Sequence, residues 1–412
     1  MITEQHVPQF RFKDFSDSWE QRRLGDVAQS FEYGLNAAAL EYDGENKYLR
    51  ITDIDDETHE FKTDALTTPD VDLAKADNYR LQDGDVLFAR TGASVGKAYR
   101  YKASDGLVYF AGFLIRARIK PEYDTEFIFQ STLTDSYNRY VSITSQRSGQ
   151  PGVNAQEYAE FELSVPKIDE QRQIGQLFKQ LDRLLTLHQR KLELLKRLKQ
   201  GYLQKLFPQN GENVPELRFK GYYDAWEQRR LSNYITITGG NAWKSSDYSI
   251  DGDYLVVTIS NVQGQRNIND KIGNKISVAD PGKYLLRRED ILVSLTGNVG
   301  RVSRMTDIPA VLNQRVGLIK PKTKRIDDEF LFQVLSNRRF ESSMVASGQG
   351  AAQANISNND VLSYKLLVPQ DVREQSTIAH FFRNFDNTIA LHQRKLEKLQ
   401  ELKKGYLQKM FC

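Results

Sequence analysis

The sequence predicts an α+β protein in which two globular heads are separated by two long helices, which pair as an antiparallel coiled coil within a pseudo-two-fold internal duplication. Three observations predict this fold. The chain contains an internal duplication, and each copy ends in a long amphipathic segment. The interior of each copy holds short apolar runs between turn residues. A length of 412 residues is enough for two to four domains.

The internal repeat consists of four blocks that recur in the same order. Trp19 and Trp226 lie in the first block, 207 positions apart, and His188 and His392 lie in the last, 204 positions apart. This period is too long for a solenoid, so the repeating unit is a domain followed by a helix. The paired blocks are residues 8–24 with 215–231, 85–97 with 290–301, 165–166 with 368–369, and 187–207 with 391–411.

The two copies have not diverged evenly. Their ends match closely, whereas residues 26–84 and 232–288 share almost no sequence that can be aligned. Two similar frames with unlike interiors indicate one scaffold that presents two different binding surfaces.

Composition excludes several classes of protein. The formal charge is only +3, and 27% charged with 40% hydrophobic residues is typical of folded domains rather than of disordered or membrane chains. The N-terminus has no apolar signal region, and no stretch is apolar enough to span a bilayer. A single cysteine, Cys412, excludes an internal disulfide and a cysteine-rich zinc module. We therefore expect a soluble protein in a reducing compartment, the cytoplasm.

The first long helix is predicted over residues 170–207, with Asp169 as its N-cap and Pro208 closing it. Apolar residues recur at alternating spacings of three and four, and the second copy repeats the same seam with the same polar interruptions, which favours a two-helix coiled coil. An amphipathic helix packed on its own domain is the alternative. The seam residues are Phe178, Leu181, Leu185, His188, Leu192 and Leu195, followed by Phe382, Phe385, Ile389, His392, Leu396 and Leu399.

Connectivity predicts the direction of the two helices. The second head lies between the end of the first helix and the start of the second, so the helices should run antiparallel over roughly 55–60 Å. His188 and His392 should then lie close together. A histidine in a helical seam more often sets register than ligates a metal or catalyses a reaction, so we assign this pair a structural role.

The heads are expected to contain several strands and one longer helix each, over residues 125–144 and 327–347. A Ser-Gly-Gln turn, at 148–150 and 347–349, and a final strand then lead to the Val-Pro pair. Equivalent strands are expected at 85–90 and 113–121 in the first copy and at 290–295 and 315–321 in the second.

Catalytic motifs fail their structural requirements. Residues 92–96 fit the string G-x-S-x-G, but a nucleophile elbow needs a following helix and later acid and histidine partners, and the second copy has no serine there. With Lys97 the same loop is one residue short of a P-loop. The five histidines lack zinc-ligand spacing, and neither an Asn-Pro-Pro-Tyr tetrad nor a glycine-rich methyl-donor loop is present. We expect no enzyme activity and no metal site in this chain.

The two Thr-Gly loops favour binding instead. Glycine lets a backbone approach phosphate closely, and Lys97 and Arg301 supply positive charge; a surface hairpin with solvated charges fits equally well. Helical residues 170–207 carry a net charge of +6 and residues 374–411 carry +3, which leaves −6 for the rest of the +3 chain. Acidic heads on basic helices are not typical of a protein that holds DNA alone, so either basic faces are locally segregated or partner subunits supply much of the positive charge.

In order along the chain, these motifs resemble the specificity subunit of a type I restriction-modification system. They are the Trp-Glu-x-Arg-x-Leu segments at 19–24 and 226–231, the Thr-Gly loops, the Glu-Gln pairs that follow Val-Pro, and the Gly-Tyr-Leu-Gln-Lys ending of each helix. No single motif is specific, but their duplicated order is, and it covers essentially the whole chain.

The resemblance implies a sequence-specific DNA-binding subunit that is not itself an enzyme. Each head would read one half of a bipartite, asymmetric DNA site, and the helices would set the spacer and dock two modification (methyltransferase) subunits. Two restriction (translocase and nuclease) subunits would complete the complex, and S-adenosylmethionine, ATP and Mg²⁺ would belong to these partners. The implied segments are target recognition domain 1 (1–166), spacer helix 1 (167–208), target recognition domain 2 (209–369) and spacer helix 2 (370–412).

Candidate DNA contacts rest on loop position and side-chain chemistry alone, because Arg, Lys, Asn, Gln and Ser supply most contacts to bases and phosphates. The alternative function is a coiled-coil adaptor with two protein-binding heads, which would retain no DNA selectively. The candidate residues are Arg90, Ser94, Lys97, Gln150, Asn298, Arg301 and Gln349.

Overall fold

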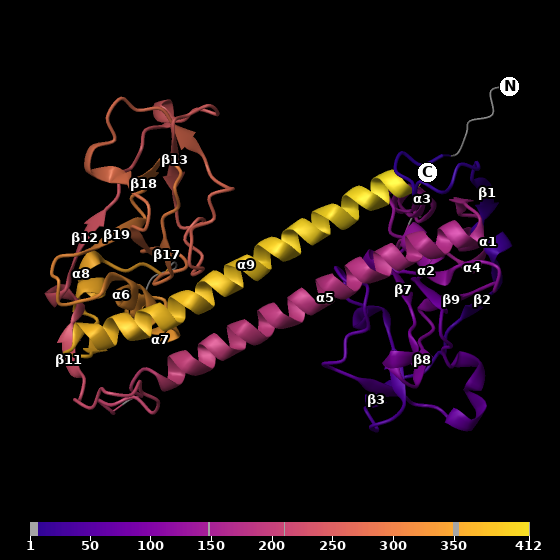
Figure 1. Ribbon diagram of the computed structural model, residues 1–412, viewed down its shortest axis with the longest axis horizontal. Coiled ribbons are helices and arrows are strands. Elements are labelled where there is room, and N and C mark those ends of the chain that lie inside the picture. The colour runs from indigo at the N-terminus through magenta and orange to yellow at the C-terminus, as the bar shows by residue number, and fades with distance from the viewer. Residues whose placement is uncertain (1–6, 147–148, 210, 349–353, 412) are drawn as a thin grey trace. The chain divides into compact units, whose positions relative to one another are not determined.

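The structure, a computed structural model, describes residues 7–146, 149–209, 211–348 and 354–411 (Figure 1). It forms two compact units. Each unit contains a globular part, called head 1 or head 2 here, and a segment of both long helices. The sequence analysis divided the chain into four segments, with the helices assigned separately from the heads. That division remains a prediction. Unit 1 holds Met1–Lys191 and His392–Cys412, and unit 2 holds Leu192–Leu391.

Head 1 is built on an antiparallel sheet in the strand order β2 (Ala28–Tyr33), β9 (Leu114–Ile119), β6 (Val86–Ala89) and β7 (Ala98–Arg100). Every residue of β6 is buried, as expected for a central strand covered on both faces. Shorter pairs are β1 (Glu20–Arg23) with β10 (Glu162–Val165), β3 (Ala39–Glu41) with β5 (Thr67–Pro69), and β4 (Lys47–Leu49) with β8 (Val108–Phe110), of which only the last is parallel.

Head 2 repeats this sheet and adds a second one. The repeated sheet has the order β12 (Ile235–Gly239), β19 (Val316–Pro321), β16 (Ile291–Ser294) and β17 (Val302–Arg304). The second sheet has the order β14 (Lys275–Ile276), β13 (Tyr254–Val257), β18 (Ala310–Leu312) and β15 (Leu285–Leu286). The pair β11 (Glu227–Arg230) and β20 (Lys365–Val368) matches β1 and β10.

The helices of the heads are shorter than the sequence predicts. The single helix expected over 125–144 is wrong: the structure has two helices, because hydroxyl groups end one helix and start the next. Thr132 donates to the carbonyl of Phe129, and the Thr134 hydroxyl accepts from the amide of Tyr137 as the new N-cap. The helices of head 1 are α1 (Leu24–Val27), α2 (Thr125–Ser131), α3 (Asp135–Thr144) and α4 (Ala155–Ala159).

The single helix expected over 327–347 in head 2 is wrong for the same reason, because the structure has two helices there. Asn337 caps a new helix in the middle of the segment expected to be one helix, and its side chain accepts from the amide of Arg339. The helices are α6 (Asp328–Leu335), α7 (Arg338–Ser347) and α8 (Asn358–Ser363).

The two long helices are α5 (Ile168–Lys205) and α9 (Val372–Met410). Because α5 begins at Ile168, Asp169 lies inside its first turn and is not the N-cap that the sequence predicts. A phenylalanine just past the end of each long helix packs in an aromatic core that is the same in the two units. In unit 1, Phe127 of α2 contacts Trp19 at 5.7 Å between ring centroids and stacks on Phe411 at 5.1 Å. In unit 2, Trp226, Phe330 and Phe207 repeat this contact.

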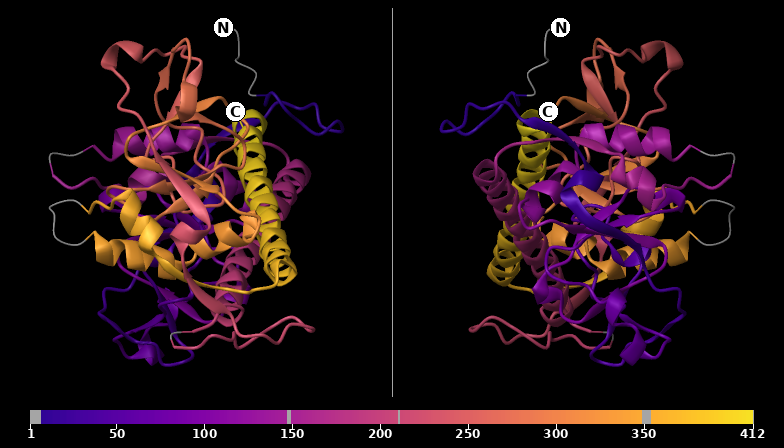
Figure 2. Two further views of the ribbon diagram at one scale, coloured as in Figure 1. Left: turned by 90° about the vertical axis from the view of Figure 1, so that its left-hand side faces the viewer. Right: turned by 90° about the vertical axis from the view of Figure 1, so that its right-hand side faces the viewer.

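Segments of α5 and α9 pair antiparallel within each unit, as the sequence predicts, and the ribbon views show the two helices side by side (Figure 1 and Figure 2). In unit 1, Asp182 contacts Lys403 at 2.6 Å, and one helical turn and a half further along α5, His188 meets His392, which precedes Lys403 in α9. In unit 2, Lys199 contacts Asp386 at 2.5 Å, and Tyr202 meets Phe381 at 5.1 Å between ring centroids. All twelve residues of the predicted seam are buried or half-buried.

The predicted approach of His188 and His392 is confirmed, with 2.9 Å between their Nδ1 atoms. One ring must donate the proton and the other must accept it, so the two copies differ in protonation at this point. None of the helices in the described part of the chain is sufficiently long and hydrophobic to span a bilayer.

Candidate nucleic-acid interface

The predicted binding loop of head 1 connects β6 to β7 and is held by two buried tyrosines. The Tyr158 hydroxyl accepts from the amide of Gly96 at 3.0 Å and donates to the carbonyl of Ala89 at 2.7 Å. The Tyr137 hydroxyl donates to the carbonyl of Gly96 at 2.9 Å. Gly96 has φ +85°, and a Cβ there would lie 2.5 Å from Val141, so glycine is required for this close approach. The loop is therefore rigidly positioned.

The backbone amides of this loop are largely occupied. The amide of Gly92 donates to the carbonyl of Pro151, that of Val95 to Gly92, and that of Lys97 to Ser94. A phosphate cradle of the kind considered from the sequence needs several amides that point outward. This loop therefore offers side chains rather than a backbone nest.

Lys97 and Ser94 differ from the expectation of free, DNA-facing groups. The Lys97 ammonium pairs with Asp56 and donates to the carbonyl of Ile54 at 3.2 Å, and only 11% of its side chain is exposed. A phosphate contact by Lys97 would require this ion pair to break. Ser94 is half-buried in a short 3₁₀ turn, and no hydrogen bond to a histidine is found for it among the described residues.

Arg90 belongs to this loop, and Gln150, from the connection between α3 and α4, lies beside it. The guanidinium of Arg90 stacks over the ring of Tyr33 at 4.9 Å from the ring centroid. Gln150 is exposed, and its Nε2 atom would lie 3.1 Å from a Cβ placed on Gly92. The structure therefore places Arg90 and Gln150 in two neighbouring segments, with Tyr33 beside Arg90 as a residue that sequence reasoning missed.

In head 2, the equivalent loop joins β16 to β17. Asn298 is exposed, and its carbonyl accepts from the hydroxyl of Ser294. Arg301 is half-exposed and pairs with Glu341 of α7 at 3.2 Å. Gln349 lies outside the described residues. The DNA-binding role of all these residues remains a prediction.

A turn beside each of these two loops was not identified from the sequence. The turn between β8 and β9, residues 111–113, lies beside the Arg90 segment, because the amide of Arg90 donates to the carbonyl of Phe113 at 3.0 Å. In head 2 the turn 313–315 lies beside Leu295 in the same way, with the amide of Leu295 donating to the carbonyl of Arg315 at 2.9 Å. Phe113 and Arg315 are the first residues of the equivalent strands predicted at 113–121 and 315–321, and this shared position is the signal that the sequence held.

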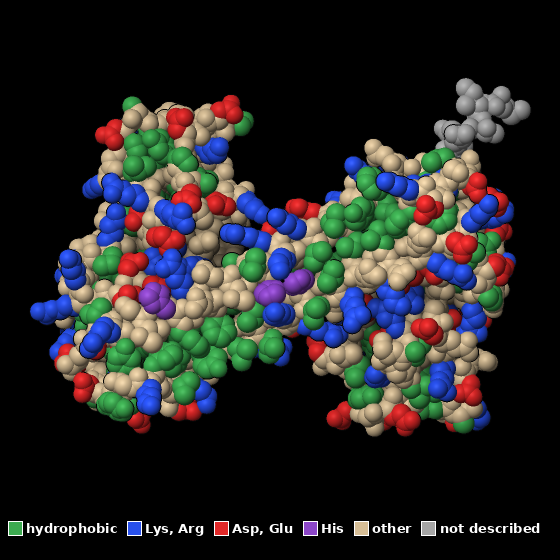
Figure 3. Space-filling model, in the orientation of Figure 1, with side chains coloured by type: hydrophobic (Ala, Val, Ile, Leu, Met, Phe, Trp, Pro, Cys, Tyr) green, Lys and Arg blue, Asp and Glu red, His purple; other side chains and the backbone are tan. Residues whose placement is uncertain are grey.

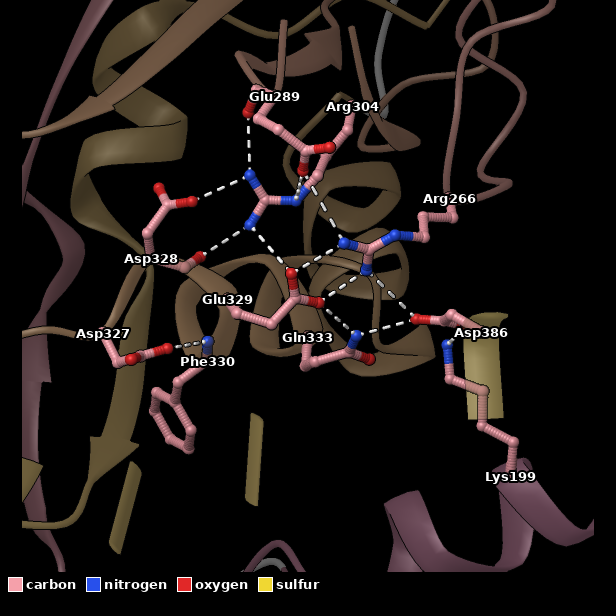
Figure 4. Close-up of polar contacts among 10 residues, drawn as sticks. All are labelled: Lys199, Arg266, Glu289, Arg304, Asp327, Asp328, Glu329, Phe330, Gln333 and Asp386. Carbon is pink, nitrogen blue, oxygen red and sulfur yellow. Dashed lines mark hydrogen bonds and ion pairs between the residues drawn. The ribbon is translucent and has the colours of Figure 1, made fainter. Parts of the chain in front are cut away.

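Head 2 is tied to the paired helices by a buried polar network, drawn in Figure 4. Glu329 of α6 accepts two hydrogen bonds from Arg266, at 2.6 and 2.8 Å, and contacts Arg304 of β17 at 3.4 Å. Gln333, one turn along α6, donates to Glu329 and to Asp386 of α9, both at 2.9 Å. Asp386 then pairs with Lys199 of α5, so the network connects the sheet, α6 and both long helices.

Head 1 has the same network with one cation fewer. Arg100 of β7 pairs with Glu126 of α2 at 2.9 Å. Gln130 donates to Glu126 at 2.9 Å and to Asp182 of α5 at 2.8 Å, and Asp182 pairs with Lys403 of α9. In place of Arg266, the ring of His59 lies against Phe129, with 6.4 Å between centroids.

The missing cation changes the electrostatics of the two carboxylates. Burial raises the pKa of Glu126, and Arg100 opposes this shift without cancelling it. Burial would likewise raise the pKa of Glu329, but the hydrogen bonds and charge of Arg266 outweigh it, so the pKa lies below its ordinary value. Burial also lowers the pKa of His59, whose Nδ1–H donates to the carbonyl of Ala98 at 3.0 Å.

The outer face of α5 carries apolar side chains that the fold does not cover. Leu184 and Leu187 in unit 1 are 42% and 57% exposed, and Leu194 and Leu198 in unit 2 are 57% and 43% exposed. Figure 3 shows hydrophobic side chains in green over this helix. Their spacings along α5 fit a second helical seam. Within the described ranges, no group of three or more His, Cys, Asp and Glu side chains could hold a metal ion.

The sequence matches one protein family twice, over residues 16–197 and 223–401, and that family is described as the type I restriction modification DNA specificity domain. Two relatives come from Methanocaldococcus jannaschii. The type I restriction enzyme MjaVIII specificity subunit is 22% identical over 94% of this chain and 91% of its own, and the MjaX specificity subunit is 23% identical over 97% and 94%. The crystal structure of a type I restriction-modification S subunit from M. genitalium is similar in fold, with a TM-score of 0.70 at 14% identity over 98% of this chain and 99% of that chain.

Proposed function

This chain belongs to the type I restriction modification DNA specificity family, and from that premise we propose that it is the DNA-reading subunit of a type I restriction-modification complex. Each head reads one half of a bipartite, asymmetric DNA site. The DNA is methylated and cut by partner subunits, in the cytoplasm.

The observation that carries this proposal is the contrast between the two heads. Both have the same central sheet, the same aromatic core and the same polar network to the long helices. Their loops differ in sequence, and head 2 has a second four-stranded sheet in the region where head 1 has only short strand pairs. A shared frame with unlike surfaces fits a protein that reads two different half-sites.

The exposed apolar face of α5 supports a docking role for the long helices. Four leucines at helical spacing would be covered by an amphipathic helix of another chain. We assign this face to two modification subunits, which would carry S-adenosylmethionine, and two restriction subunits would bring ATP and Mg²⁺. α9 offers a weaker face with Leu391 and Leu402, 52% and 43% exposed.

In this proposal the chain is a reader and not a catalyst. The serine that fits a nucleophile motif, Ser94, has no hydrogen-bonded base among the described residues, and Lys97 is paired with Asp56. Chemistry on the DNA is thereby left to the partners, and this chain decides only where that chemistry takes place.

The test exchanges residues 1–166 for the corresponding head of a relative and maps methylated adenines in a genome that carries the complex. We expect one half of the recognised site to change and the other half to stay the same. A change in both halves, or in neither, contradicts independent reading by the two heads. In a parallel DNA-retention assay with modification subunits present, an adaptor with protein-binding heads would give no sequence selectivity.

A further inference from the structure

Two turns make the same backbone hydrogen bonds in the two heads. One lies between β8 and β9 in head 1, and the other lies between β18 and β19 in head 2. In head 1, Leu35 donates its amide to the carbonyl of Phe110 at 2.8 Å and accepts from the amide of Gly112 at 2.8 Å. In head 2, Asn241 donates to Leu312 at 3.1 Å and accepts from Gln314 at 3.0 Å. We call residues 111–113 tip 1 and residues 313–315 tip 2.

Each tip is also closed and braced in the same way. The amide of Leu114 donates to Ala111 at 2.8 Å, and that of Val316 donates to Asn313 at 2.9 Å. A glycine packs directly against each tip, because a Cβ at Gly34 would collide with the carbonyl oxygen of Ala111, and one at Gly240 would collide with that of Asn313. The two tips are therefore rigid for the same structural reasons.

The side chains that the tips present are entirely different. The sequence of tip 1 is Ala-Gly-Phe, and Phe113 is 63% exposed. Tip 2 reads Asn-Gln-Arg, with Gln314 and Arg315 both exposed. No hydrogen bond or ion pair of the Arg315 guanidinium to another described residue is found, although Arg315 is anchored by its amide, which donates to the Asn313 side chain at 3.1 Å.

These exposed side chains do not hold the tips in place, because the bracing contacts are made by the backbone, and no partner of the Arg315 guanidinium is found among the described residues. Rigid backbone reduces the conformational entropy that is lost on binding. A braced turn with side chains that change between copies is thus suited to reading a different ligand with each copy.

We infer that the two tips are base-reading elements for double-stranded DNA, an inference that rests on the proposed function. The side chains of Arg315 and Gln314 are of the types that form paired hydrogen bonds with the major-groove edges of guanine and adenine, respectively. Phe113 cannot donate hydrogen bonds, and it reads by apolar contact with a thymine methyl group or by insertion at a base step. Arg90, stacked on Tyr33 beside tip 1, supplies the adjacent positive charge.

The experiment uses the full chain together with the modification subunits of its own system and maps methylated adenines across the host genome. One variant carries the sequence of tip 2 in head 1 (Ala111→Asn, Gly112→Gln, Phe113→Arg), and a second carries Arg315→Ala. We expect the first variant to change the preferred bases only in the half-site of head 1. The second should lower discrimination at one position of the other half-site by roughly tenfold to a hundredfold.

Matched controls separate reading from general surface effects. Ile143→Arg introduces a charge at a residue of α3 in head 1 that is 65% exposed and lies outside residues 26–84, and Arg325→Ala removes an exposed arginine of head 2 away from the tip. Both should leave the recognised site unchanged. The inference is overturned if the tip variants keep the wild-type site, or if Arg315→Ala weakens binding equally at all sequences, as a phosphate contact would.

The same data distinguish this failure from failure of the proposed function. If the tips do not read bases, the wild-type complex still methylates a bipartite site, and the head exchange still alters one half of it. If the proposed function is wrong, no bipartite site is found with the wild-type chain.

Discussion

At the scale of single residues, Glu126 and Glu329 are two largely buried carboxylates at equivalent positions of the two heads, so they can be compared directly. Both accept from a glutamine one helical turn away, and both contact an arginine of the sheet. Only Glu329 also receives Arg266. A buried carboxylate is stabilised as an ion only where its hydrogen bonds and counter-charges repay the cost of desolvation.

We therefore expect Glu329→Gln to destabilise the protein more than Glu126→Gln. Loss of Glu329 leaves Arg266 and Arg304 buried with fewer counter-charges, at a cost of about 3–5 kcal/mol. Loss of Glu126 removes a charge that its site holds poorly, at about 1–2 kcal/mol. Urea unfolding at pH 7, followed by tryptophan fluorescence, measures both. Equal losses would contradict the comparison.

The pH dependence of these two effects has opposite sign. The pKa of Glu329 is lowered, so its stabilising contribution is present above the ordinary value of 4.5 and is lost as the pH falls through the lowered pKa. The pKa of Glu126 is raised, so the folded state keeps a proton that the unfolded state loses, and stability falls as the pH rises above 4.5. Unfolding series of the two variants should diverge from wild type in these opposite directions.

At the scale of elements, the paired long helices contain polar positions that have structural partners. Lys199 with Asp386 and Lys403 with Asp182 connect α5 to α9 in the two units, and the same aspartates accept from the glutamines of α6 and α2. The polar interruptions of the seam therefore fix the register of each helix pair and hold the head against it. A purely apolar seam would hold the helices together without selecting one alignment.

The histidine pair gives the helix pairing a pH dependence. Burial lowers the pKa of His392, and the charges of Lys191, His188 and Lys395 lower it further. The stability that depends on a neutral His392 is therefore present above its ordinary value of 6.5 and is lost as the pH falls below it. We expect thermal unfolding to occur at lower temperature at pH 5.5 than at pH 7.5, and the His188→Leu, His392→Leu double variant to reduce this difference. An unchanged pH dependence in the double variant would rule out the pair as its source.

At the scale of the whole molecule, each unit combines one head with segments of both long helices. Each of these helices is continuous from one unit into the other, and α5 alone has 38 residues, or about 57 Å of helix. We propose that this length sets the spacer between the two half-sites. Heads and spacer would then be independent properties of the molecule.

An insertion tests that independence. Four residues added to α5 after Lys191 and four added to α9 after Leu391 lengthen each helix by about 6 Å at the boundary between the units. We expect the unread gap to grow by about two base pairs while both half-sites stay the same. An insertion in α5 alone, which breaks the pairing with α9, should abolish recognition. An unchanged gap in the double insertion would exclude the helices as the ruler.

The sequence by itself determined the duplication, the two long helices, their antiparallel pairing and the approach of His188 to His392. These features are encoded in local spacing and chain connectivity, which periodicity and repeat alignment detect directly. The family follows from the same repeated motifs.

The tertiary structure alone decided where the polar groups point. Lys97 stays a predicted DNA contact by its loop position, but its ammonium pairs with Asp56, and no spacing rule predicts a partner that lies 41 residues away. The helix breaks at Thr134 and Asn337 depend on hydroxyl and amide caps that compete with the helical ladder. The two tips are recognised as equivalent only from hydrogen bonds between distant segments, which are the same in both heads although the side chains differ. Local patterns determine elements, whereas the orientation and pairing of side chains depend on which segments meet in three dimensions.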